Sequence, residues 1–129
     1  MPLVKIEILK GKSPEYKKTL FEEVHRALVD AFKIKEDDRL QRLYELDEEY
    51  FEIPKYKSGN FTLIELTVFK GRSYEAKRAL YNAIAENLKK SLGIDSNDIL
   101  IVINEPPLEN WGIKGKPANE VDLGFKIDV

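Results

Sequence analysis

Two stretches of the sequence decide the fold: Lys10–Phe21 (KGKSPEYKKTLF) and, 60 residues later, Lys70–Tyr81 (KGRSYEAKRALY). Six of the twelve positions are identical, and three more carry the same kind of side chain. The spacing persists beyond these stretches, so that Asp38 for example recurs as Asp98. An ungapped match of this length indicates an internal duplication, which has to be found before a fold is assigned.

The first copy predicts a strand, a helix and a second strand. Val4, Ile6 and Ile8 alternate with charged residues, as in a strand that buries one face. Ser13 is suited to cap a helix and Pro14 to occupy its first turn. Apolar residues at helical spacing follow, and a second strand is expected near residues 40–45.

The second copy predicts the same order with clearer boundaries. A strand is expected over Phe61–Phe69 and a helix over Tyr74–Leu92, which Gly93 is suited to end. The last strand, Ile99–Asn104, is apolar almost throughout, which favours a central position in a sheet.

The sequence therefore predicts one α/β (α+β) domain built from two β-α-β repeats, residues 2–45 and 61–105, followed by a tail, residues 106–129. The two units should join into one four-stranded mixed sheet with both helices on one face. Leu9, Leu63 and Phe69 project to the other face, and an exposed apolar face favours an oligomer. The charged, aromatic connection 45–60 reads as a wrapping loop, and the tail as a short hairpin against a neighbouring subunit.

Composition excludes several classes of function. Lys and Arg number 21 against 23 Asp and Glu, so no basic excess points to nucleic acid. Cysteine is absent and histidine occurs once, so no metal site or disulfide is expected. Charged residues interrupt the amino terminus, and no apolar run approaches the roughly 20 residues that span a bilayer. We expect a cytoplasmic protein with no membrane partner.

Pro2 permits two readings. A proline at the first residue of a strand is structurally harmless, because its missing N–H need not interrupt a ladder. If Met1 is removed, however, Pro2 becomes a secondary amine at the end of a rigid element. Burial and nearby cations would lower the pKa of such an amine, and the neutral form could act as a general base.

A Met-Pro start on a duplicated β-α-β chain resembles the tautomerase superfamily, in particular its fused, double-length members and the malonate semialdehyde decarboxylase group. The resemblance covers nearly the whole chain, and the residues that carry it are Pro2, Asp38-Arg39-Leu40-Gln41, Lys70-Gly71-Arg72, Asn104-Glu105 and Asn110-Trp111-Gly112. It implies catalysis by the amino-terminal proline without a cofactor, and a homotrimer. The decarboxylases have two arginines after the third strand; here Arg72 matches one, but Lys70 occupies the place of the other. That departure argues against malonate semialdehyde as the substrate.

Arg72 and Lys70 are the expected anion-binding residues, since arginine holds a carboxylate through two hydrogen bonds and lysine adds a point charge. The alternative is ordinary solvated charge, because Lys10 and Lys12 repeat the pattern in the first copy. The resemblance also implies that Asp38 orients substrate or activates water, although a turn residue fits the sequence equally well.

Four further residues have competing interpretations. Arg39 and Trp111 could contact substrate, but an ion pair and a packing anchor are the competing interpretations. Tyr44 is a weaker candidate for a wall of the pocket. The single histidine, His25, lies at the margin of the helical apolar stripe, which favours a hydrogen-bonded core or interface residue over a catalytic one.

The predicted function is proton transfer on a small 2-oxo acid or its enol by a cofactor-free tautomerase. Decarboxylation or hydration, as in the malonate semialdehyde decarboxylases, is an alternative outcome of the same site. A ferredoxin-like module that binds a small effector also has a β-α-β-β-α-β order and needs no free Pro2. A trimeric scaffold that has lost activity is the remaining reading.

Overall fold

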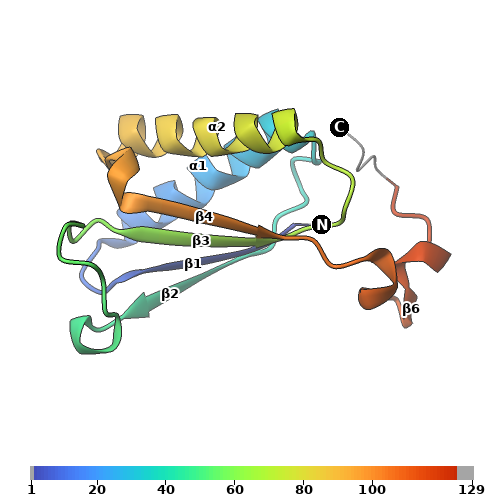
Figure 1. The fold of residues 1–129 in the computed structure, drawn as a ribbon, viewed down its shortest axis with the longest axis horizontal. Coiled ribbons are helices and arrows are strands. Elements are labelled where there is room, and N and C mark those ends of the chain that lie inside the picture. The colour runs from blue at the N-terminus through green and yellow to red at the C-terminus, as the bar shows by residue number, and fades with distance from the viewer. Residues whose placement is uncertain (1, 125–129) are drawn as a thin grey trace.

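The computed structural model describes residues 2–124. Two helices lie side by side over one face of a four-stranded sheet, and a small hairpin follows the last strand (Figure 1). The main elements, in chain order, are β1 (Leu3–Leu9), α1 (Pro14–Phe32), β2 (Gln41–Leu46), β3 (Thr62–Thr67), α2 (Tyr74–Leu92), β4 (Ile99–Asn104), β5 (Gly112–Ile113) and β6 (Lys116–Pro117). The predicted duplicated β-α-β fold is confirmed.

The helices begin in the same way in the two repeats. The hydroxyl oxygens of Ser13 and Ser73 each accept a hydrogen bond of 3.1 Å from the backbone N–H three residues on. This bond satisfies one of the N–H groups that the first turn leaves unpaired. The helices end on Lys33 and Gly93, both in the left-handed region, with φ of 58° and 68°. Glycine adopts this conformation without strain, whereas lysine does so at a cost.

The strand order is β2-β1-β3-β4, with β1 parallel to β2, β3 parallel to β4, and β1 antiparallel to β3. Lys5 lies opposite Glu65, its own counterpart in the second repeat, and their side chains form an ion pair at 3.4 Å. The two halves of the chain are therefore related by an approximate two-fold axis that passes between these residues.

The expectation that Ile99–Asn104 is a central strand is wrong within one chain, because β4 is an edge strand. Its residues alternate between half-buried and exposed. Leu100 and Val102 are 51% and 41% exposed on the face of the sheet away from the helices. The apolar run is explained by an uncovered face rather than by a central position.

The core lies between the sheet and the helices. Its fully buried side chains come from alternate positions of β1 and β3 and from one face of each helix; the larger ones are Ile6, Ile8, Leu20, Leu28, Phe32, Ile64, Leu66, Leu80, Ile84 and Leu88. The buried residues of α2, Leu80, Ile84 and Leu88, lie four residues apart on one face of the helix. The opposite face of the sheet carries Leu9 and Leu63, half-buried, and the exposed Tyr44. Phe69 is instead buried beyond the end of β3.

The tail forms a two-residue-per-strand hairpin, β5 with β6, beyond the end of β4. The last five residues of the predicted tail, 125–129, lie outside the described part of the chain. Neither α1 nor α2 is long and apolar enough to cross a lipid bilayer, and the same holds for every helix within residues 2–124.

Candidate functional site

One end of the sheet gathers Pro2, Asp38 and Arg72, and we call it the first end. Leu3 lies opposite Thr67, so the start of β1 lies where β3 leaves the sheet toward α2. The Val4 N–H donates to the Leu40 carbonyl at 3.0 Å, which brings the segment before β2 to the same place. Figure 1 shows the start of β1 beside the connection that leads from β3 to α2. β1 and β3 are thus neighbours in the sheet.

Arg72 is a buried guanidinium with a free edge. The residue is only 5% exposed, and the central carbon of its guanidinium lies over the Phe32 ring, 5.0 Å from the ring centre. Nη1 donates to the Phe69 carbonyl at 3.3 Å. Nε and Nη2 are buried and have no hydrogen-bond partner among residues 2–124. Buried polar groups are almost always paired, so these two atoms require an explanation.

The electrostatics of the first end combine one buried cation with two nearby carboxylates. Burial lowers the pKa of Arg72, and the negative charges of Asp38 and Glu105 act in the opposite direction. Arginine stays protonated in proteins, so the site retains a positive charge. Nε and Nη2 share one edge of the guanidinium, and this edge can donate two parallel hydrogen bonds to one carboxylate.

The other residues expected here are distributed unevenly. Pro2 is buried and Asp38 is half-buried in the turn before β2. Lys70 lies in the same connection as Arg72, but it is exposed. Trp111 packs its ring on Phe69, with centroids 4.4 Å apart, and its Nε1 donates to the Pro106 carbonyl at 3.2 Å. The tail therefore reaches the first end through Trp111.

Two predicted substrate contacts lie elsewhere in the chain. Arg39 donates to both carboxylate oxygens of Glu22, at 2.9 and 3.4 Å, and this hydrogen bonding lowers the pKa of Glu22. Arg39 thus forms the ion pair that the sequence offered as its structural interpretation. Tyr44 lies opposite Glu7 on the uncovered face, 46% exposed, so a single chain does not bring it to the first end.

His25 is buried and hydrogen-bonded, with Nε2 2.8 Å from the Glu36 carbonyl oxygen. The interpretation as a core histidine is therefore confirmed. Sequence reasoning missed Phe32 and Phe69, which hold Arg72. The repeat itself contained a signal for Phe32: the second copy has Leu92 at the equivalent position, so the aromatic ring is a difference between the two halves.

The opposite end of the sheet, which we call the second end, carries the repeat-related counterparts of these residues. Lys12 corresponds to Arg72, and its ammonium donates to the Asn60 side-chain oxygen. Asp98 corresponds to Asp38, and it accepts hydrogen bonds from the backbone N–H and the hydroxyl of Ser58. Both charged groups are thus bonded to the segment that connects the repeats, whereas part of Arg72 is unbonded.

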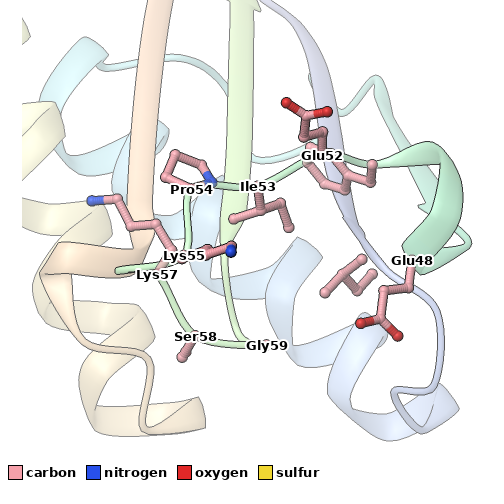
Figure 2. A pocket seen from close by; sticks show the side chains of 10 residues that line it. Glu48, Glu52, Ile53, Pro54, Lys55, Lys57, Ser58 and Gly59 are labelled. Carbon is pink, nitrogen blue, oxygen red and sulfur yellow. The ribbon is translucent and has the colours of Figure 1, made fainter.

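A cavity of about 360 Å³ lies at the second end (Figure 2). Leu9 contributes from the end of β1, and the remaining lining residues belong to the connection, between Glu48 and Gly59. None of the site residues predicted from the sequence lines this cavity.

The sequence and the fold were compared with those of known proteins. Family models described as tautomerase enzyme match residues 38–114 and residues 2–55. Probable tautomerase YusQ of Bacillus subtilis is 27% identical over 95% of this chain and all of its own length.

Solved structures have the same fold. FG41 malonate semialdehyde decarboxylase, inhibited by 3-bromopropiolate, superposes with a TM-score of 0.77 at 27% identity, over 84% of this chain and 86% of its own. A fused 4-OT determined as an asymmetric trimer superposes with a TM-score of 0.81 at 22% identity, over 92% and 97%. The chain belongs to the tautomerase family and is a fused, double-length enzyme of the tautomerase type.

Proposed function

We propose that Pro2, exposed as an amino terminus by removal of Met1, is the general base and acid of a cofactor-free tautomerase acting on a small 2-oxo acid or its enol carboxylate. The observation that carries this proposal is the free edge of Arg72 at the end of the sheet where β1 begins. A buried, unpaired pair of N–H donors on a cation fits a carboxylate in both charge and geometry.

The proposed reaction moves one proton between oxygen and carbon. The neutral Pro2 nitrogen accepts the proton of the enol hydroxyl, and the carbonyl forms as the C=C electron pair moves to carbon. The protonated nitrogen then delivers its proton to that carbon, which restores the neutral amine. Arg72 holds the carboxylate and stabilises the developing negative charge in the transition state.

Burial supports the protonation state that this role requires. Pro2 is buried in the described chain, and desolvation disfavours a charged amine. The positive charge of Arg72 acts in the same direction. Asp38 opposes it, and its proposed role is to orient the substrate. In this proposal Lys70 gives long-range attraction and Trp111 forms part of the pocket wall.

Decarboxylation or hydration is the second candidate reaction. It is favoured by the likeness to FG41 malonate semialdehyde decarboxylase and by the nearby charges of Asp38 and Arg72, with Asp38 then activating water. Lys70, in place of a second arginine, argues against 3-oxopropanoate as the substrate and so favours tautomerisation. Product analysis by NMR after incubation with 3-oxopropanoate distinguishes the two reactions.

We also propose a homotrimer as the active assembly. The helix-free face of the sheet carries exposed apolar side chains, and trimers occur among fused 4-OT structures. In such an assembly Tyr44 and Arg39 could contact the site of a neighbouring subunit, although neither reaches the first end of its own chain.

The test is ketonisation of an arylenolpyruvate by untagged protein whose intact mass confirms removal of Met1. Pro2→Ala should lower kcat/KM by about 100-fold or more, the usual contribution of a general acid or base. Lys12→Ala, at the repeat-related cation, should leave turnover unchanged. Equal activity of the Pro2→Ala and parent proteins would overturn the assignment.

A further inference from the structure

The duplication gives each end of the sheet the same set of positions. Lys12 follows β1 as Arg72 follows β3, and Asp98 precedes β4 as Asp38 precedes β2. The scaffold around them is also repeated: Lys17 pairs with Glu45 at 3.0 Å, and Lys77 with Glu105 at 2.7 Å. The second end therefore repeats the arrangement that we propose as the anion site at the first end, with lysine in place of arginine.

At the second end, the segment that connects the repeats lies between the acidic and the basic group. Ser58 bonds to Asp98 through its N–H at 2.9 Å and through its hydroxyl, while the Asn60 side chain accepts from Lys12. The Asn60 N–H donates to the Ser58 hydroxyl oxygen at 3.1 Å, which ties the two together. Ser58–Asn60 thus bridges the acidic and the basic group, and we call it the bridge.

We propose that the second end is a dormant carboxylate site, closed by the chain's own bridge. The amide oxygen of Asn60 stands where a carboxylate oxygen would meet Lys12. The inference takes its ligand class from the proposed role of Arg72, but the contacts that define the bridge are independent of that role.

The neighbouring cavity provides the room that opening requires. Ser58 and Gly59 are part of its lining, beside Lys57 and Lys55 (Figure 2). Displacement of the bridge would join the 360 Å³ cavity to the space beside Lys12 and Asp98. Thr62 occupies the position of Pro2 in this repeat, so the opened site would bind without general-base catalysis.

The experiment measures binding of pyruvate by calorimetry in a Met-free protein. Wild type should bind one pyruvate per chain, and Arg72→Ala should abolish this. Ser58→Gly combined with Asn60→Gly should add a second event, about tenfold weaker because lysine supplies only a point charge. Adding Lys12→Ala should remove that second event alone.

Hydrogen exchange at the backbone amide of residue 58 establishes whether the bridge has opened. If the two glycine substitutions impair folding, Ser58→Ala combined with Asn60→Ala is the milder variant. A folded variant with a fast-exchanging amide and no Lys12-dependent binding would overturn the dormant site. Pyruvate binding that depends on Lys12 in wild type would also overturn it, since the bridge would then not close the site. If wild type binds no pyruvate at the Arg72 site but the Ser58/Asn60 variant still shows the Lys12-dependent event, the proposed function is refuted and this inference stands.

Discussion

Arg72 and Lys12 differ in what surrounds them more than in charge. The guanidinium lies over the Phe32 ring and is bonded to the Phe69 carbonyl through Nη1, while its Nε and Nη2 are buried without a hydrogen-bond partner among residues 2–124. The Lys12 ammonium is half-buried, donates one of its three N–H groups to Asn60 and lies 5.0 Å from the Tyr16 ring centre. The buried, unpaired donors of Arg72, rather than its charge, distinguish the proposed site from its counterpart.

Replacing Arg72 by lysine tests that distinction. Arg72→Lys keeps the charge but loses the two-donor edge, so KM for an enol carboxylate should rise about 10- to 100-fold, equivalent to roughly 1.5–3 kcal/mol for bonds to a charged group. Steady-state kinetics would measure the change, with Lys12→Arg as the matched control that should have no effect. An unchanged KM would show that Arg72 does not hold the substrate.

Phe32 should act through Arg72. Phe32→Leu installs the residue of the second repeat and removes the cation–π contact, which contributes about 0.5–2 kcal/mol. KM should rise severalfold while kcat changes less. Leu88→Ala is the control, because it opens a cavity in the core at about 2–5 kcal/mol without touching the guanidinium. If both variants shift KM equally, Phe32 has only a packing role.

At the scale of elements, the boundaries of α2 were predicted well because the signals were local. Ser73, the apolar stripe and Gly93 define the helix without reference to the rest of the chain. The place of β4 at an edge could not be predicted, since strand order depends on tertiary pairing. The same holds for the free edge of Arg72 and the bridge, which exist only when residues 40 to 48 positions apart are brought together.

The first turn of α2 offers a stabilising change. Pro14 occupies the first turn of α1, whereas Tyr74 stands at the equivalent place and is 73% exposed. Tyr74→Pro should raise the free energy of unfolding by about 0.4–1 kcal/mol, because proline restricts the unfolded chain and its φ suits this position. Urea unfolding would test this, and a lower stability would mean that the Tyr74 side chain packs more than its exposure indicates.

The bridge should make the free energy of unfolding fall as the pH is lowered. Hydrogen bonds from Ser58 lower the pKa of Asp98 in the folded protein. A carboxyl with a lowered folded pKa stabilises the protein above its unfolded pKa, and the contribution is lost as pH falls through the folded value. Unfolding followed from pH 7 downward should therefore show a shallower acid loss in Asp98→Asn and in Ser58→Ala. Parallel curves for variants and wild type would contradict the linkage.

At the scale of the molecule, the uncovered sheet face should mediate assembly. Leu100 and Val102 are exposed in the isolated chain, on the edge strand of that face. Sedimentation should give a species of three times 14.9 kDa, and Leu100→Asp with Val102→Asp should convert it to monomer. Tyr56→Asp, on a residue 76% exposed in the connection, is the control. A monomeric wild type would refute the trimer.

The Lys5–Glu65 pair has a consequence for how the two halves recognise each other. In a homodimer of one half, the residue on the axis meets its own copy, so lysine would face lysine or glutamate would face glutamate. Like charges directly opposite in a sheet are unfavourable, whereas the fused chain places opposite charges there. Separately expressed halves should accordingly prefer each other to themselves. Opposite charges at the axis require two different halves, so a symmetric dimer of identical halves could not have this selective pairing.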